Sequence, residues 1–434
     1  MPLDTHHLAS VLASAQEELG IPGVAVGVLD GGESWRWSGG VTNLDHPLPV
    51  TAQTIFQIGS ISKTFAGTAA MALVDDGRLD LDVPIRTYLP DLRLSSPELT
   101  DGVTMKHLLT HAAGWVGDYF ADTGMGDDAL ALFVAKLVKA PQVAALGEAY
   151  SYSNSGFNLA AHVVATVAGC PYERAVKDLV LQPLGMSQTF YKSDDAITQR
   201  VAVGHRGNIP QPWRRPRAHC GAGGVLSCVD DLLRYTEFHL GDGTPIMSTA
   251  NLDLMHAPAR PAGSLCDEVG LVWMIDHHGD DVVVHHGGTT NGYQADLRLV
   301  PGRDLGWVML TNCDHYHQLD PILKAALLGP EPVTTPWVPD DLGEYTGRYE
   351  AALADLALRV DGGVLVLDVG TPVRAMWNPS EPPAPPIPTR LSFRDADRVV
   401  ATDMPWRGHR GEFVRGSDGA IRWFRWDGRL ARPV

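Results

Sequence analysis

The alternation of apolar and polar positions near the start of the chain predicts a β-hairpin. Residues 23–29 form a run of glycine, alanine, valine and leucine, which is typical of a buried strand. Asp30-Gly31-Gly32 is a turn signal, and residues 33–39 return with alternating polar and aromatic positions. Much later in the chain, four further segments have strand character: residues 271–275, 281–285, 293–299 and 306–310.

The chain between these two groups of strands is helical in character. Residues 64–74 are mostly small and apolar, which favours a buried helix. Helical segments broken by long loops continue from about residue 60 to residue 235. Because strands from both ends enclose the helices, we expect an α/β (α+β) fold, with one antiparallel sheet flanked by helices and a helical lobe beside it.

The composition changes near residue 329, where proline and threonine become frequent. We therefore divide the chain into a large domain at residues 1–328, a linker at 329–340 and a small domain at 341–434. The small domain has short alternating segments separated by glycine turns, which predict a small antiparallel β-barrel. Its proline-rich run at residues 379–388 predicts a stiff loop.

Composition and charge narrow the classes of function. The formal net charge of −17 argues against partners that are nucleic acids or anionic membranes. No stretch reaches the ~18 apolar residues of a membrane span, and the first residues lack the basic and apolar regions of a signal peptide, so we expect a cytoplasmic chain. The odd number of cysteines, five, and the absence of Cys-x-x-Cys favour free thiols over disulfides or a zinc–thiolate site.

Candidate chemistry begins at Gly59-Ser60-Ile61-Ser62-Lys63, where a short extended segment meets the predicted helix. Residues three apart in a helix share a face, so the Ser60 hydroxyl and the Lys63 amine would be neighbours at the positive end of the helix. This arrangement is a nucleophile with a base beside it. Serine and lysine also occur at this spacing by chance, as a helix cap and a solvated lysine.

Two further motifs carry polar groups suited to a cleft. In Tyr152-Ser153-Asn154, the first and third side chains of an extended loop would point the same way. In His286-Gly287-Gly288-Thr289, glycines at the end of a strand leave its edge bare for a substrate backbone. The alternatives are a polar loop that caps a helix near Phe157 and a tight turn between strands.

The three motifs together resemble the serine β-lactamase and penicillin-binding protein superfamily, and within it the class C β-lactamase branch, which includes D-aminopeptidases and esterases. The order Ser-x-x-Lys, Tyr-x-Asn, His-x-Gly is that family's signature, and the resemblance covers roughly residues 10–328. It implies a β-lactamase-like fold. The tail around Tyr345-Thr346-Gly347-Arg348-Tyr349 resembles, more loosely, the lipocalin-like domain of some members. Three other stretches also match: residues 105–114, 182–186 and 222–227.

The resemblance implies roles for these side chains. Ser60 would be the nucleophile and would form an acyl-enzyme, and Asn154 would orient Lys63 and the substrate. Lys63 and Tyr152 are both candidates for the base, with reference pKa values of ~10.4 and ~10, and the sequence does not assign the proton between them.

The resemblance also implies an oxyanion hole. Its donors would be the backbone N–H groups of Ser60 and of Thr289. Gly287 and Gly288, which precede Thr289, would help to bind the substrate. No cofactor and no metal is implied.

His286 stands where β-lactamases and transpeptidases usually carry lysine. Histidine is mostly neutral at pH 7, so it attracts a substrate carboxylate less than lysine does. We therefore expect a serine hydrolase that cleaves an ester, amide or D-peptide bond in a small-molecule or peptide substrate. The alternatives are an acyltransferase or macrocyclising thioesterase that passes the acyl group to an amine, and a β-lactamase. The oligomeric state stays open.

Two hypotheses that assign the chain to other functional classes are less favoured. A cluster of His and Asp residues could indicate a metallohydrolase, but adjacent strand residues face opposite sides, so His285 and His286 would not share one ion. A sensor or assembly module would commonly have lost a catalytic side chain, whereas all of the motif residues are present. The cluster consists of Asp276, His277, His278, Asp280, Asp281, His285 and His286.

Overall fold

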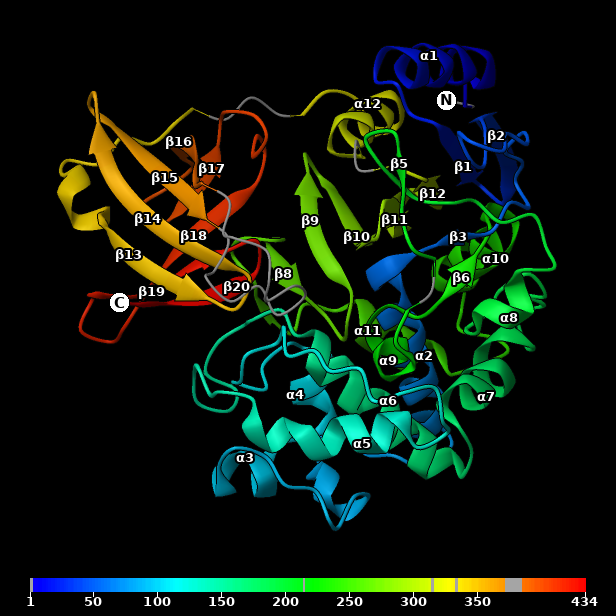
Figure 1. The fold of residues 1–434 in the computed structure, drawn as a ribbon, viewed down its shortest axis with the longest axis horizontal. Coiled ribbons are helices and arrows are strands. Elements are labelled where there is room, and N and C mark those ends of the chain that lie inside the picture. The colour runs from blue at the N-terminus through cyan, green and yellow to red at the C-terminus, as the bar shows by residue number, and fades with distance from the viewer. Residues whose placement is uncertain (1–2, 214, 314–315, 332–334, 371–384) are drawn as a thin grey trace.

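The computed structural model consists of a large α/β part and a closed β-barrel built from the end of the chain, as Figure 1 shows. Both parts were expected from the sequence, and the mixed architecture is confirmed. The exact boundaries of the predicted division, including the linker, remain a prediction. The structure describes residues 3–213, 215–313, 316–331, 335–370 and 385–434.

One antiparallel sheet of eight strands organises the large part, in the order β2-β1-β12-β11-β10-β9-β8-β7. The hairpin near the start of the chain pairs with a strand from far along it, with Val26 opposite Met309. The sheet is therefore assembled from both ends of this part, as predicted. Its strands are β1 (Gly23–Asp30), β2 (Glu33–Gly40), β7 (Arg260–Pro261), β8 (Glu268–Val269), β9 (Met274–His278), β10 (Asp281–Thr290), β11 (Tyr293–Val300) and β12 (Leu305–Thr311).

The strand expected at residues 271–275 is displaced along the chain. Val272 has a φ of 76°, which lies in the left-handed region, and its N–H donates to Leu109 O at 2.9 Å instead of to a neighbouring strand. The strand β9 therefore begins only at Met274. Asp276 lies within β9, opposite Val283.

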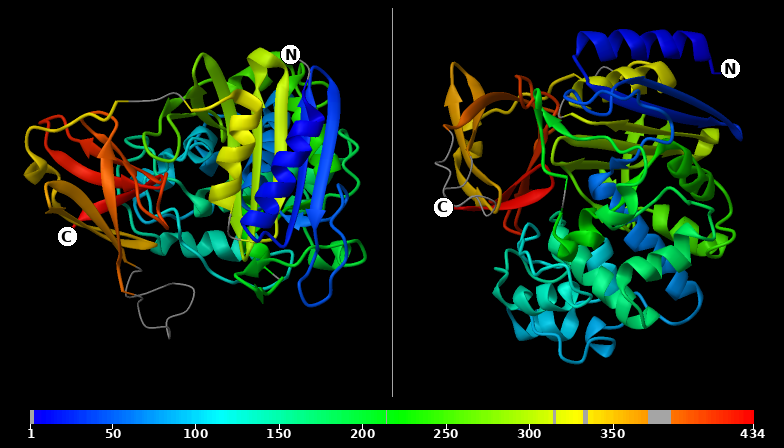
Figure 2. Two further views of the ribbon diagram at one scale, coloured as in Figure 1. Left: turned by 90° about the horizontal axis from the view of Figure 1, so that it is seen from above. Right: turned by 45° about the vertical axis from the view of Figure 1, so that its right-hand side comes forward.

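Helices cover both faces of the sheet (Figures 1 and 2). On one face, α1 (Thr5–Glu18) packs beside α12 (Tyr316–Leu328), with Leu8, Leu12 and Leu319 buried against the strands. The helical lobe lies on the other face and shares a second, larger core with it. Its helices are α2 (Ser62–Asp75), α3 (Pro97–Gly102), α4 (Met105–Leu109), α5 (Ala129–Lys136), α6 (Asn154–Ala168), α7 (Tyr172–Val176), α8 (Ser193–Ala196), α9 (Cys220–Gly223), α10 (Val229–Leu240) and α11 (Thr249–His256).

The barrel closes on itself, because its first strand pairs with its last. Large aromatic side chains fill its interior, among them Phe413 and Phe424 with ring centroids 4.8 Å apart. Of the proline-rich run, residues 379–384 lie outside the described residues, and Pro388 belongs to a strand. The barrel strands are β13 (Gly347–Ala351), β14 (Ala354–Asp361), β15 (Val364–Gly370), β16 (Ile387–Phe393), β17 (Arg398–Ala401), β18 (Arg410–Arg415), β19 (Ile421–Trp426) and β20 (Arg429–Pro433).

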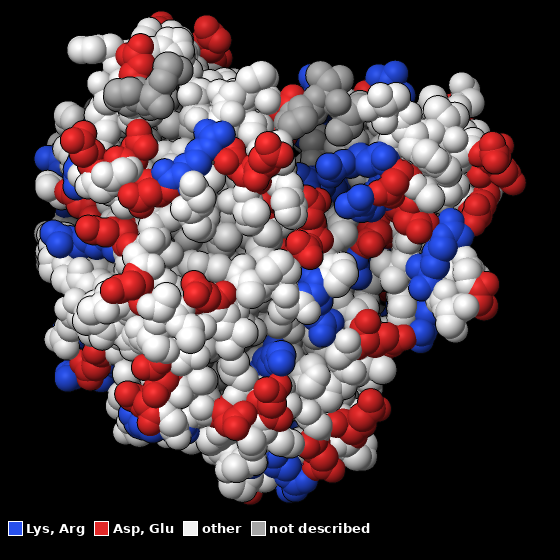
Figure 3. Space-filling view, turned by 180° about the vertical axis from the view of Figure 1, so that it is seen from behind, with Lys and Arg blue, Asp and Glu red and all other residues white. Residues whose placement is uncertain are grey.

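The barrel packs directly against the large part, along a seam that contains both apolar and charged contacts. Trp423 and Leu430 of the barrel form one buried cluster with Ala144 and Ala149. In Figure 3, side chains of both signs mingle along this seam. The ion pairs across it include Arg410–Asp276 at 3.0 Å, Arg422–Glu148 and Arg429–Asp118. In the described part of the chain, no helix is long and apolar enough to span a membrane.

Candidate active site

Ser60 and Lys63 lie where a 3₁₀ turn (Gly59–Ile61) leads into α2, as the sequence predicted. Lys63 is fully buried, and its Nζ lies 2.9 Å from Ser60 Oγ. The same nitrogen donates to Asn154 Oδ1 at 2.7 Å and to the Ala222 carbonyl at 2.8 Å. The lysine is thus held against the serine hydroxyl by two further contacts from other segments.

The environment of Lys63 disfavours its charged form. Burial is the largest cause that lowers the pKa of Lys63 well below its usual range, and the nearby Arg429 guanidinium acts in the same direction. The Asp118 carboxylate opposes the shift, and Arg215 adds to it. A lowered pKa favours the free amine, which is the form that can accept a proton from the neighbouring hydroxyl.

Tyr152 and Asn154 reach the same point from a different segment. Ser153 between them is the N-cap of α6, and its hydroxyl accepts from the Gly156 N–H at 2.9 Å. The helix therefore begins at Asn154, three residues earlier than expected. The Tyr152 ring lies with its centroid 4.8 Å from Lys63 Nζ and is stacked on His111 at 4.5 Å.

The Tyr152 phenol is buried and retains its proton near neutral pH. Burial raises the pKa of Tyr152 to about 12, although a hydrogen bond with Ser60 and the charge of Arg429 oppose the shift. The pKa values of Lys63 and Tyr152 are thus pushed apart, which is the arrangement expected of an acid and a base that work together.

The third motif, which begins at His286, lies on β10 in close contact with the turn that carries Ser60. Gly59 has a φ of +52°, and a Cβ there would lie 2.6 Å from the Thr289 nitrogen. A Cβ on Gly288 would lie 3.0 Å from the Ser60 nitrogen. Both glycines are needed for this close approach. It brings the Ser60 and Thr289 backbones together, as an oxyanion hole requires.

His286 is buried and neutral. Burial is the largest cause that lowers the pKa of His286 to about 3. Its Nδ1 lies 2.7 Å from the Gly287 carbonyl, which only accepts, so Nδ1 carries the proton. The Nε2 atom is then an acceptor, and it has no hydrogen-bond partner among the described residues. Its one donor therefore serves the backbone and is not free to donate to a substrate.

Three residues near these side chains have no signal of their own in the sequence. Asp118 accepts from Asn154 Nδ2 at 2.6 Å, and Arg429 of the barrel donates to Asp118 at 3.0 Å. His111 stacks on Tyr152, and its Nδ1 accepts from the Ser153 N–H at 2.9 Å. Only His111 lies within a stretch that we had noted, and none of the three could be found from local spacing.

The His and Asp cluster does not converge. His285 Nε2 lies 3.2 Å from Asp276, which also accepts from Arg410, whereas His286 bonds to its neighbour's backbone. Across the described ranges, no three His, Cys, Asp or Glu side chains are grouped so that they could hold a metal ion.

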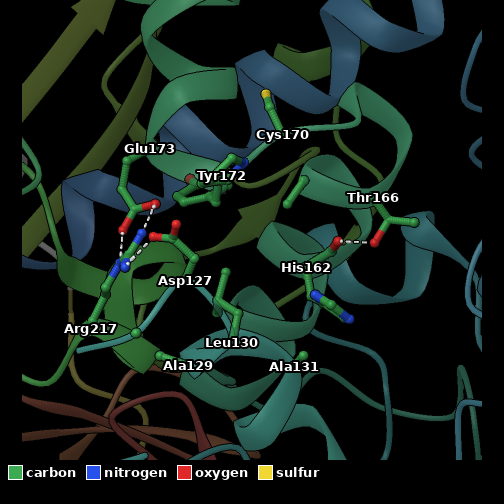
Figure 4. A pocket seen from close by; sticks show the side chains of 13 residues that line it. Asp127, Ala129, Leu130, Ala131, His162, Thr166, Cys170, Tyr172, Glu173 and Arg217 are labelled. Atoms are coloured by element: carbon green, nitrogen blue, oxygen red, sulfur yellow. Dashed lines mark hydrogen bonds and ion pairs between the residues drawn. The ribbon is translucent and has the colours of Figure 1, made fainter. Parts of the chain in front are cut away.

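A separate cavity of about 310 Å³ lies among α5, α6 and α7, and none of the predicted site residues lines it (Figure 4). Arg217 at its wall is already bound by two carboxylates, Glu173 at 2.6 Å and Asp127 at 2.7 Å. This cavity is therefore distinct from the predicted site.

The fold and the three motifs are those of the serine β-lactamase and penicillin-binding protein superfamily. The model of the Beta-lactamase family matches residues 8–328, and the chain belongs to this family. The recognition made from the sequence is thereby confirmed. The family is one of serine hydrolases, which supports the expectation of an enzyme and leaves the particular activity to be proposed.

Three similar proteins illustrate the range of the family. Penicillin-binding protein 4 of Amycolatopsis lactamdurans is 31% identical over 72% of this chain and 86% of its own. The crystal structure of SurE with D-Leu has a TM-score of 0.77 at 25% identity and matches 99% of both chains. A class C β-lactamase of Rhodobacter sphaeroides has a TM-score of 0.64 at 25% identity, over 75% of this chain and 100% of its own. The SurE match therefore includes the barrel.

Proposed function

We propose that this chain is a serine hydrolase that forms an acyl-enzyme at Ser60 with ester, amide or D-residue peptide substrates. The observation that carries the proposal is the 2.9 Å contact between Ser60 Oγ and a fully buried Lys63 whose pKa is lowered. A serine hydroxyl is a weak nucleophile until a base accepts its proton.

In the proposed acylation, neutral Lys63 accepts the Ser60 proton as Oγ bonds to the substrate carbonyl carbon. The oxyanion that forms is stabilised by the N–H groups of Ser60 and Thr289, each worth roughly 3 kcal/mol. As the bond to the leaving group breaks, the Tyr152 phenol donates its proton to that group. The proton on Lys63 then passes to Tyr152, and the free amine is restored. Water attacks the acyl-enzyme by the same steps in reverse order.

The neutral His286 supports our ranking of substrates. A lysine at this position would attract a carboxylate, whereas a histidine with a pKa of about 3 carries no charge at neutral pH. Ester, amide and D-peptide hydrolysis therefore come first. Acyl transfer to an amine comes second, because SurE, which matches both parts of this chain, has been crystallised with D-Leu, a molecule that bears a primary amine. A β-lactamase comes third.

A panel of substrates separates these activities. We expect turnover of a p-nitrophenyl ester and of a D-alanyl anilide. Loss of one charge-assisted contact corresponds to roughly 10- to 100-fold, so a chromogenic cephalosporin should react slower by that factor. Added D-Leu should yield an N-acylated product only if the enzyme transfers acyl groups. A cephalosporin rate equal to the ester rate would place β-lactamase activity first.

Tyr152→Phe tests the proposed acid. It removes only the phenol oxygen, so hydrolysis of the anilide should fall by about 10²–10⁴-fold, because an amine leaving group needs a proton. The p-nitrophenyl ester should lose much less, since p-nitrophenolate leaves without one. We would measure kcat/KM for both substrates. Equal losses on both would assign the phenol to the activation of Ser60 instead.

A further inference from the structure

A buried carboxylate connects the barrel to the predicted catalytic lysine. Asp118 is 1% exposed, and its two oxygens face different partners. Oδ1 accepts from Asn154 Nδ2 at 2.6 Å, and Oδ2 accepts from Arg429 Nε at 3.0 Å. Asn154 in turn accepts from Lys63 at 2.7 Å. A continuous chain of hydrogen bonds therefore runs from the barrel to Lys63.

The same turn of the barrel also holds Tyr152. Gly428, between β19 and β20, accepts from the Tyr152 N–H at 2.8 Å and donates to Ser264 Oγ at 2.9 Å. The Arg429 guanidinium lies 4.7 Å from the centroid of the Tyr152 ring, within the range of a cation–π contact. One hairpin turn thus contacts both the backbone and the ring of this tyrosine.

The charges in this arrangement balance. A carboxylate as deeply buried as Asp118 needs a compensating charge, and Arg429 is its ion-pair partner. If Arg429 were removed, the Asp118 carboxylate would act unopposed on Lys63 and would favour its ammonium form. If Asp118 were neutralised, Arg429 would instead favour the free amine.

We propose that the barrel completes the catalytic centre, with Arg429 as a positioning residue that acts on Asn154 through Asp118 and on Tyr152 through its ring. This inference rests on the function proposed above. The inference adds the barrel to the proposed active site. The family model, which ends at residue 328, does not include this part of the chain.

The electrostatics of Lys63 agree with this role. After burial, Arg429 is the largest cause that lowers the pKa of Lys63, and Asp118 opposes it. Burial alone would lower the pKa of Arg429, but the Asp118 carboxylate outweighs burial and raises it, so the guanidinium stays charged. The titratable and charged groups that face Lys63 from the surrounding elements are Arg429, Asp118, Arg215, Tyr152, His111 and His286.

Two substitutions with opposite expected effects test the inference. In Arg429→Gln, the acidic limb of the kcat/KM profile should move to higher pH by about one to two units, because Lys63 needs a higher pH to lose its proton. In Asp118→Asn, it should move to lower pH. The double variant should return towards the wild-type midpoint, and Arg429→Lys, which keeps the charge, should lie nearer to it than Arg429→Gln.

A matched control separates this effect from the docking of the barrel. Arg422→Gln breaks another ion pair across the seam, with Glu148, at a side chain that is 54% exposed. It should leave the midpoint unchanged. Shifts of the same sign in Arg429→Gln and Asp118→Asn, or a shift in Arg422→Gln equal to that in Arg429→Gln, would overturn the inference.

A second measurement does not depend on turnover. With ¹³C-labelled lysine, the Lys63 signal can be assigned by its loss in Lys63→Met and titrated by NMR in each variant. The pKa of Lys63 should rise in Arg429→Gln and fall in Asp118→Asn. If Ser60 fails to react with a fluorophosphonate while these shifts occur, the proposed function fails, although Arg429 and Asp118 still act on Lys63. If Ser60 reacts and the shifts are absent, the inference fails alone.

Discussion

Ser60→Ala abolishes turnover of the ester and of the anilide while leaving the fold intact. The substitution removes only Oγ, and Lys63 keeps its contacts with Asn154 and Ala222. Loss of the nucleophile in such a centre costs on the order of 10⁶-fold in kcat. We would measure turnover, the mass increase on reaction with a fluorophosphonate, and the thermal midpoint of unfolding.

The neighbouring Ser62 provides the control. Its hydroxyl donates to the Gly59 carbonyl at 2.6 Å and accepts from the Val225 N–H at 2.9 Å, so it holds the turn that carries Ser60. Ser62→Ala should cost about 1–3 kcal/mol of stability and still react with the fluorophosphonate at Ser60. Reaction that persists in Ser60→Ala and is lost in Ser62→Ala would refute the assignment of the nucleophile.

Lys63→Met lowers kcat/KM by about 10²–10⁴-fold and stabilises the protein at pH 7. The activity falls because no base remains to accept the Ser60 proton. Wild-type activity should rise with pH as Lys63 loses its proton, and this limb should disappear in the variant. Lys63→Arg keeps a cation that does not deprotonate, so it should lose as much activity. Activity retained in Lys63→Arg would mean that charge, not basicity, is what Ser60 requires.

The stability effect has a definite sign. The pKa of Lys63 is lower in the folded protein than the ~10.4 of an unfolded chain, so folding at neutral pH must expel a proton or bury a charge. This cost is full below the folded pKa, shrinks as pH rises towards the unfolded value, and vanishes above it. Methionine relieves the cost, so the increase in thermal midpoint should be larger at pH 7 than at pH 10.

The sequence predicted those parts of the fold and site that local patterns encode. Ser60 and Lys63 share a helical face because they are three residues apart, and the strands β10, β11 and β12 follow from their apolar runs. The left-handed Val272 carries no such signal, since it depends on a hydrogen bond to Leu109 from the helical lobe. The start of β9 was therefore misplaced.

The electrostatic partners of the site could not be predicted in the same way. Asp118 lies in a loop of the large part and Arg429 at the start of a barrel strand, and neither stands at an informative spacing from the motifs. Only the docking of the barrel brings the two together. The sequence also could not predict that His286 Nδ1 carries the proton, because this depends on the position of one carbonyl oxygen.

The contact between Gly428 and the Tyr152 N–H has a consequence for how the protein is made. Ribosomes add ~5–20 residues per second, so the hairpin turn is synthesised on the order of tens of seconds after Tyr152. Throughout that interval the nascent polypeptide already contains Ser60 and Lys63, while Asp118 still lacks its guanidinium partner. Translation itself thus separates the appearance of the nucleophile from the assembly of its surroundings.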